Sequence, residues 1–307
     1  MNDEHLPAVT GTQAGGGRTA HPAAVSTPAV IPPQAERDEQ LLALWLFDRP
    51  EETRRAYAAD VRGVLAHTGT TIQATTLGHV QGFVAALGAL APASRGRKLS
   101  AVKSLFGFAH RLGYVPFNVA APVRQPAVKH VLAERIIAEV DVHRLLALEA
   151  NPRNRALLAV LYIAGVRISE AAGLCWRDAQ PRDDAGQLTV FGKGGRTRAV
   201  LLPRATWALL AALRGEAAPD APMFRSRRGS ALDASQVHRV VKAAAKRAGL
   251  PAEVSAHWLR HAHASHALDR GAPVHLVQAT LGHASVATTG RYLHARPTDS
   301  SAKYLAG

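Results

Sequence analysis

The sequence predicts a mainly α-helical fold of the α+β class, and two observations support this prediction. Apolar residues recur at steps of three and four along most of the chain, most clearly over residues 94–112, which is the spacing of an amphipathic helix. Two short runs typical of strands, at 188–191 and 198–202, flank a Gly-Lys-Gly-Gly turn and indicate one small antiparallel sheet. The apolar stripe expected in residues 94–112 consists of Leu99, Val102, Phe106 and Ala109.

The first part of the chain is expected to form a tail followed by four helices. Residues 1–35 are rich in Ala, Gly, Pro and Thr and lack apolar periodicity, which predicts disorder. They do not resemble a signal peptide, because no basic start is followed by an apolar core. No run in the chain is long and apolar enough to span a membrane. The four helices are predicted at Arg37–Phe47, Glu51–His67, Leu77–Leu87 and Ser94–Leu112.

Length and proline placement predict two domains. A chain of 307 residues is longer than most single domains, and Pro116, Pro122 and Pro126 mark a break in the helical pattern. A single cysteine excludes an intramolecular disulfide framework. The expected division is a first domain at 36–120, a linker at 121–132 and a second, mostly helical domain at 133–307 with its small sheet near 187–202.

The charge of the chain favours a nucleic-acid partner. The formal net charge is +14 and the pI is about 10.8, as expected for a protein that binds polyanions. Polar and basic residues also lie opposite the apolar stripes of two predicted helices, where they could follow phosphates; an ordinary solvated face is the alternative. The predicted DNA contacts are Arg97, Ser104 and Arg111 on one helix, and Arg239, Lys242 and Lys246 on a helix at about 234–248.

The segment from His257 to Tyr292 holds side chains suited to phosphodiester chemistry. It reads HWLRH, then LGH ending at His283, then a tyrosine. Attack on a phosphodiester builds negative charge on the nonbridging oxygens, which fixed cations must stabilise. Arg260 stands three residues after His257, so both side chains should lie on one helix face, with His257 near the helix N-terminus.

A second arginine is expected to complete the anion site. Arg167 follows the apolar run ALLAVLYIAGV, and arginine donates two parallel hydrogen bonds to phosphate. Glu170, three residues later, could orient this arginine from behind.

Four motifs in this order resemble the tyrosine recombinase (integrase) family, and most of all its bacterial Xer-type and phage or transposon integrase branch. The similarity covers about residues 36–300. The motifs are AGVRISEAAGLCW (164–176), FGKGGRTRAVLLP (191–203), HWLRHAHASHAL (257–268) and LGHASVATTGRYLH (281–294).

The resemblance implies a role for each residue that matches the motifs. Arg167 and Arg260 would clamp the phosphate, and Tyr292 would be the nucleophile. His257 would accept the tyrosine proton. His283 would bind a nonbridging oxygen, and Lys193 would protonate the 5′-oxygen leaving group.

The resemblance also implies an architecture and a reaction. The first domain would be a SAM-like core-binding domain, and the two domains together would clamp duplex DNA. Tyr292 would form a 3′-phosphotyrosyl bond, which stores the phosphodiester energy, so that no metal, ATP or other cofactor is required. Two subunits would occupy a core site and four a synapse, either of this protein alone or with a related recombinase. The segment Arg296–Gly307, with Tyr304 and Leu305 as apolar anchors, would dock onto a neighbouring subunit; a frayed tail is the alternative.

Other interpretations remain open at this point. His257 and His261 have a spacing that can hold zinc, but no acidic residue joins them and the one cysteine is Cys175; His261 and His263 are expected to pack or hydrogen-bond locally. The alternative functions are a type IB topoisomerase, a catalytically silent DNA-binding protein and a metal-dependent nuclease. A recombinase would act in the cytoplasm at the nucleoid, in chromosome-dimer resolution or in mobile-element integration and excision.

Overall fold

The computed structural model describes residues 34–127, 132–192 and 195–292. The chain divides into two compact units, Met1–Val128 and Lys129–Gly307. Within the described residues no helix is long and apolar enough to cross a membrane. Of the predicted tail at 1–35, only residues 34 and 35 are among the described residues.

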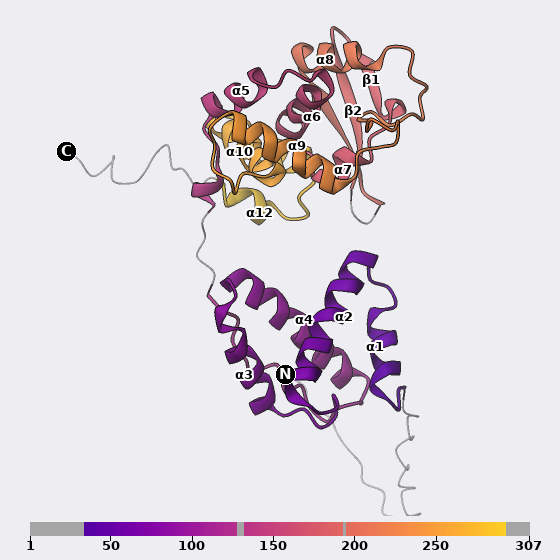
Figure 1. Cartoon of the computed structure of the whole chain (residues 1–307), viewed down its shortest axis with the longest axis vertical. Coiled ribbons are helices and arrows are strands. Elements are labelled where there is room, and N and C mark those ends of the chain that lie inside the picture. Colours follow the sequence, from indigo (N-terminus) through magenta and orange to yellow (C-terminus); the bar gives the residue numbers. More distant parts are fainter. Residues whose placement is uncertain (1–33, 128–131, 193–194, 293–307) are drawn as a thin grey trace, which may run out of the picture. The chain divides into compact units, whose positions relative to one another are not determined.

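The described residues of the first unit form the four helices that the sequence predicts (Figure 1). The stripe predicted on α4 is confirmed, because Leu99, Val102, Phe106 and Ala109 are all buried. Helix α4 begins two residues earlier than predicted, at Pro92, since proline suits the first turn of a helix. The helices are α1 (Asp38–Leu46), α2 (Glu51–Thr68), α3 (Leu77–Ala86) and α4 (Pro92–Arg111), with a 3₁₀ turn η1 (Leu87–Ala89).

The second unit, where it is described, is mostly helical with one antiparallel sheet of order β1-β2-β3. Two strands match the predicted runs, and β1 was not predicted. The reason is that β1 has the sequence AQPR, with a proline and only one buried residue, as edge strands allow. The strands are β1 (Ala179–Arg182), β2 (Ala185–Phe191) and β3 (Thr197–Leu202).

The helices of the second unit surround a core centred on α6 (Pro152–Ile163), which is buried from Ala156 to Tyr162. Helix α6 contacts α8 and α10. Helix α8 packs against β2, where a side chain at Gly186 would lie 2.1 Å from the Trp207 ring. The other helices are α5 (Glu139–Ala147), α7 (Ile168–Ala172), α8 (Arg204–Arg214), α9 (Ala234–Arg247), α10 (Ala256–Asp269), α11 (Val274–Leu281) and α12 (Val286–Gly290), with 3₁₀ turns η2 (Ala133–Arg135) and η3 (Trp176–Asp178).

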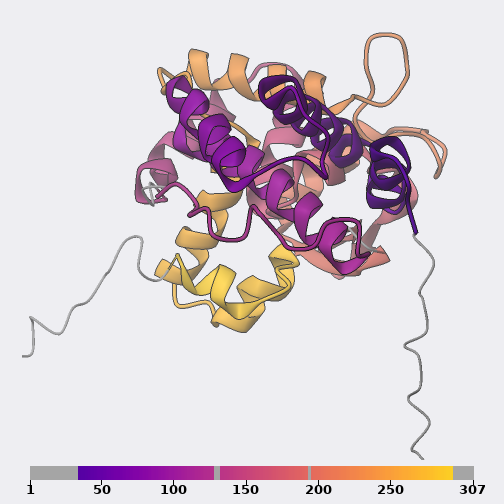
Figure 2. The same ribbon diagram turned by 90° about the horizontal axis from the view of Figure 1, so that it is seen from below.

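Helices α11 and α12 lie side by side at one edge of this unit (yellow in Figure 2). They enclose a small apolar cluster with α10 that is distinct from the main core. Its buried residues are Ala264, Val277, Leu281 and Tyr292. The tyrosine that the sequence singles out is thus part of a local core.

Candidate active site

Arg260 is the most deeply buried charged side chain of the site, with 1% of its surface exposed. It donates to the backbone carbonyls of Gly165 (2.5 Å) and Leu281 (2.6 Å). Burial, together with the neighbouring Arg167, lowers its pKa to about 10. The guanidinium stays charged at neutral pH, and its hydrogen bonds join α10 to the loop after α6 and to the end of α11.

Gly165 presents its carbonyl to Arg260 through a backbone conformation that other residues rarely adopt. Its φ is +56°, and a Cβ there would lie 2.5 Å from a methyl carbon of Leu281 and 3.1 Å from the His263 ring. Glycine is therefore required at this position for both conformation and space. In the AGVR motif, the carbonyl of Gly165 thus holds Arg260, and Arg167 follows two residues later.

Arg167 caps the start of α7 and is held by Glu170, as predicted. Its backbone N–H and its guanidinium each donate to one carboxylate oxygen of Glu170, both at 2.8 Å. The Arg167 side chain is 40% exposed, whereas that of Glu170 is only 4% exposed. Arg167 is therefore oriented from behind while its outer face is open to a solvent-borne anion.

Arg198 on β3 is a third arginine of the site that the sequence analysis did not single out. It donates to both oxygens of Glu170 (3.1 and 2.7 Å) and, through Nε, to the carbonyl of Thr280 (2.7 Å). Burial alone would raise the pKa of Glu170, but hydrogen bonds from Arg198 and Arg167 outweigh it and lower this pKa to about 2. The only sequence signal for Arg198 was its place in the strand pattern, and its pairing with Glu170 comes from the fold.

The two predicted histidines lie in different surroundings. His257, near the N-terminus of α10, is exposed, while His283, after α11, is partly buried and shares a hydrogen bond with the Thr289 hydroxyl (Nδ1 to Oγ1, 2.8 Å). When Thr289 donates, the proton of the neutral ring is on Nε2, which can then donate to a phosphate oxygen. Burial and the charges of Arg260 and Arg167 lower the pKa of His283 to about 4.

Tyr292 is buried, with 6% of its surface exposed, and burial raises the pKa of its hydroxyl. The hydroxyl lies 2.6 Å from Nδ1 of His261. The ring is parallel to that of His283 at 6.4 Å between centroids. His261 was expected to hydrogen-bond locally, and its partner is the predicted nucleophile.

Two cavities border these groups. One of about 380 Å³ is lined by Arg167, His257 and Arg260 together with His238 of α9. A larger one of about 890 Å³ is lined by Arg167, Arg198, His283 and neighbouring residues. Arg167 faces both, so an anion in either cavity would meet its exposed side. The structure thus brings five of the six predicted catalytic residues into one region of the second unit.

Some predicted site residues cannot be located. Lys193 lies outside the described residues, as do Tyr304, Leu305 and the rest of the segment Arg296–Gly307. Their predicted roles stay predictions. In the described part of the chain no group of three His, Cys, Asp or Glu side chains is arranged to hold a metal ion.

The predicted DNA contacts of the first unit have partners inside that unit. Arg97 pairs with the buried carboxylate of Asp60. Ser104 accepts hydrogen bonds from Trp45 (3.3 Å) and Arg49 (3.1 Å). Arg111 is exposed. Two of these three side chains therefore also have a structural role in the unit.

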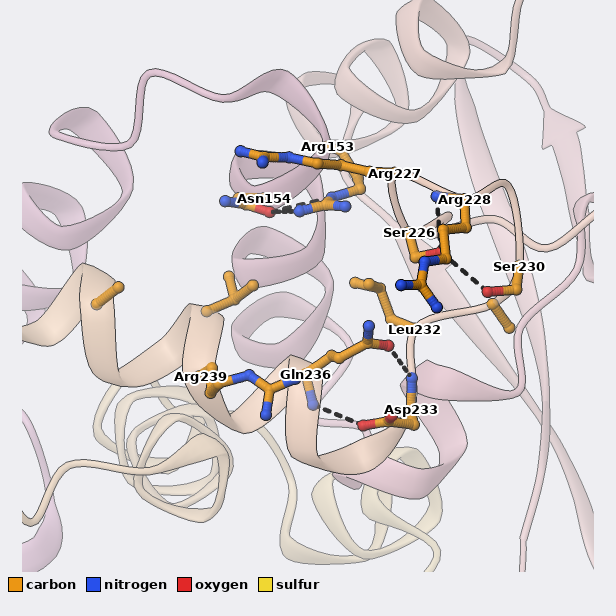
Figure 3. A pocket seen from close by; sticks show the side chains of 13 residues that line it. Arg153, Asn154, Ser226, Arg227, Arg228, Ser230, Leu232, Asp233, Gln236 and Arg239 are labelled. Carbon is orange, nitrogen blue, oxygen red and sulfur yellow. Dashed lines mark hydrogen bonds between the residues drawn. The ribbon is translucent and has the colours of Figure 1, made fainter.

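An arginine-rich cavity of about 740 Å³ borders α9 (Figure 3). Arg239 lines it with Arg153, Arg227 and Arg228. Lys246 is exposed, whereas Lys242 donates to the backbone carbonyl of Ala252. On the same helix, Val237, Val241 and Ala244 are buried and Val240 is partly buried.

Lowered histidine pKa values predict that the second unit loses stability in mild acid. Burial lowers the pKa of His261 to about 3 and those of His263 and His283 to about 4. The unfolded chain takes up these protons near pH 6.5 and the native unit does not, so stability falls as pH drops from about 6.5 towards 4. Each such histidine should lower the free energy of unfolding by about 2 kcal/mol at pH 5 relative to pH 7.5.

Denaturant unfolding of a Trp45→Phe variant would measure this loss, because Trp176, Trp207 and Trp258 then report on the second unit alone. Adding His261→Asn should make the difference between the two pH values smaller by about 2 kcal/mol. Equal stability at both pH values would contradict the prediction.

Arginines that line cavities, with a buried tyrosine hydroxyl near one of them, are the groups of a class of enzyme that can cleave a phosphodiester through tyrosine. Comparison with known proteins agrees. Residues 134–299 match the phage integrase family, and residues 45–113 match the phage integrase N-terminal SAM-like domain.

Curated relatives give the same answer. The tyrosine recombinase XerC of Pelobacter propionicus is 35% identical over 260 residues, which are 79% of this chain and 84% of the relative. The tyrosine recombinase XerD of Mycobacterium tuberculosis is 37% identical over 220 residues, 66% of this chain and 70% of the relative.

Solved structures share the fold. A post-cleavage complex of the XerH site-specific recombinase with palindromic difH substrate has a TM-score of 0.72 and 21% identity, over 89% of this chain and 85% of that one. A lambda integrase dimer bound to a COC′ core site has a TM-score of 0.67 and 18% identity, over 85% and 78%.

The chain therefore belongs to the phage integrase, or tyrosine recombinase, family, as its motifs predicted. It is a site-specific recombinase, an enzyme that cleaves and rejoins DNA. Its first unit contains the SAM-like domain of that family.

Proposed function

We propose that this recombinase exchanges DNA strands through a covalent bond to Tyr292. The tyrosine oxygen attacks phosphorus, the bond to the 5′-oxygen breaks, and the 3′-phosphate remains on the enzyme. A 5′-hydroxyl of the partner duplex then attacks the phosphotyrosine and reverses the step. The observation that supports this most is the convergence of Arg167, Arg260 and Tyr292 from three separate segments of the second unit.

Each remaining group has a proposed part in the transfer. Arg167 and Arg260 stabilise the charge on the nonbridging oxygens, and His283 donates to one of them through Nε2. His257 accepts the tyrosine proton, and Lys193 supplies a proton to the leaving 5′-oxygen. Glu170 and Arg198 hold Arg167 in place. The bond energy is kept in the phosphotyrosine, so the proposed cycle uses no metal or nucleotide cofactor.

The proposed partners are duplex DNA and further recombinase subunits. Similar folds are described as a XerH complex with difH DNA, a lambda integrase dimer on a core site and a lambda integrase tetramer on a Holliday junction. We propose that residues 36–120 and 133–307 both contact DNA, joined by the linker at 121–132. Arg239, which lines the arginine-rich cavity, and the exposed Lys246 of α9 would contact phosphates, in a protein that acts at the nucleoid.

Covalent capture tests the proposal. Nicked suicide substrates made from sheared genomic DNA of the source organism would be incubated with wild type and Tyr292→Phe in EDTA. A covalent adduct with wild type alone is expected, and sequencing the trapped DNA would show whether the site is chromosomal or the end of a mobile element. An equal adduct with Tyr292→Phe would reject Tyr292 as the nucleophile. Salt-sensitive binding without any adduct would favour a catalytically silent DNA-binding protein or one that needs a partner subunit.

A further inference from the structure

The hydroxyl of Tyr292 has one polar partner among the described residues, and that partner is His261. The phenol oxygen lies 2.6 Å from Nδ1 of the imidazole. Both side chains are buried, with 6% and 8% of their surfaces exposed. A hydrogen bond of this length in a dry site is strong and orients both groups.

The geometry indicates the direction of this bond. Within the described residues no other acceptor for the Tyr292 hydroxyl proton is present. If Nδ1 carried the ring proton and donated it, the buried phenol proton would have no acceptor, which is unfavourable. Nδ1 therefore accepts, and the ring proton of neutral His261 is on Nε2.

The Tyr292 ring packs among apolar side chains, and its hydroxyl has no second hydrogen-bond partner among the described residues. The ring packs with Ala264, Val277 and Leu281, and the parallel His283 ring is 6.4 Å away. Apolar packing limits where the ring lies, but it does not fix the direction of the hydroxyl. Arg260 is near enough for its charge to oppose the rise that burial causes in the pKa of Tyr292.

We propose that His261 is the positioning residue of the nucleophile: its Nδ1 accepts the hydrogen bond of the Tyr292 hydroxyl and holds the phenol beside Arg260 before DNA is bound. The proposal rests on the proposed role of Tyr292 and adds a residue to it. Without this acceptor the hydroxyl would be buried without a partner, and the phenol would spend less time in its position beside Arg260.

His261 is suited to orienting the hydroxyl rather than to taking its proton. Burial and the adjacent His257, whose ring centroid is 4.3 Å away, lower the pKa of His261 to about 3. Such an imidazole stays neutral and accepts a hydrogen bond, but it is a weak base. An amide oxygen should therefore replace it, since the Oδ1 atom of asparagine lies close to the place of Nδ1 and accepts without being basic.

The chain offers a matched control on the same helix. His266 is also buried, at 7% exposure, and its Nδ1 is 2.9 Å from the hydroxyl of Tyr162. His266→Leu thus breaks a second buried histidine–tyrosine contact of α10 that does not involve the nucleophile. It separates an effect on Tyr292 from a general loss of packing in α10.

The first measurement is made on the DNA-free full chain. In ¹⁵N spectra of histidine-labelled protein, the Nδ1 signal that His261→Asn removes should shift in Tyr292→Phe. An unchanged Nδ1 signal would overturn the inference whether or not the protein cleaves DNA. Absence of a wild-type adduct would instead count against the proposed function, and these spectra would still decide the contact.

The second measurement is the first-order rate of adduct formation on the captured substrate at saturating protein. His261→Leu should be slower by about tenfold, the equivalent of one lost hydrogen bond, with DNA affinity unchanged. His261→Asn should stay within about twofold of wild type with the same pH profile, as should His266→Leu. A wild-type rate in His261→Leu, or equal slowing in either of the other variants, would refute a positioning role.

Discussion

Replacing Glu170 by alanine is expected to destabilise the second unit by about 3–5 kcal/mol, because it leaves Arg198, whose side chain is only 11% exposed, without its counter-ion. Glu170 is 7% exposed and holds both Arg167 and Arg198. Denaturant unfolding in the Trp45→Phe background would measure the loss. Glu253→Ala, which removes an exposed carboxylate, is the control and should change stability by less than about 0.5 kcal/mol.

The same variant should slow adduct formation by about 100-fold, since Arg167 loses the contact that orients it towards the phosphate. The contribution of Glu170 to the free energy of unfolding also depends on pH. Its pKa is lowered to about 2, so its contribution is complete above about pH 4.5 and is lost as pH falls towards 2. A Glu170→Ala protein with wild-type stability and rate would show that Arg167 needs no support from this carboxylate.

Replacing Arg260 by lysine is expected to reduce adduct formation by at least about 1,000-fold, although the positive charge is kept. One ammonium group cannot reproduce the planar fork that reaches the carbonyls of Gly165 and Leu281 at 2.5 and 2.6 Å. At least one buried carbonyl then lacks a donor, which should lower stability by about 1–3 kcal/mol.

Arg270→Lys provides the matched control, because Arg270 is an exposed arginine at the end of the same helix that pairs with Glu139. It should leave both the rate and the unfolding curve close to wild type. An Arg260→Lys protein that forms the adduct as fast as this control would exclude a bidentate role for Arg260.

The helices of the first unit could be predicted because their signals are local. The stripe from Leu99 to Ala109 alternates at helical spacing, and all four of its predicted residues are buried. Strand β1 could not be predicted, since its four residues show no alternation of apolar and polar side chains. They pair with β2 because the chain reverses direction between the two strands.

The catalytic set could be proposed from sequence because its members are polar residues of distinctive type in ordered motifs. The roles of His261 and Arg198 could not. His261 looked like one of several histidines on a helix, and its contact with Tyr292 joins residues 31 positions apart. Arg198 looked like a strand residue, and its pairing with Glu170 joins residues 28 positions apart.

The sequence by itself determined the class of fold and the family, and it supplied the proposal for most reactive side chains, because these depend on periodicity and on residue types at fixed spacing. Only the tertiary structure decided which groups share a site, and how they are buried, protonated and hydrogen-bonded there. The burial of Arg260, the neutral histidines and the hydrogen bond on the Tyr292 hydroxyl all arise when distant segments exclude water from one another, and that exclusion is a property of the packed chain.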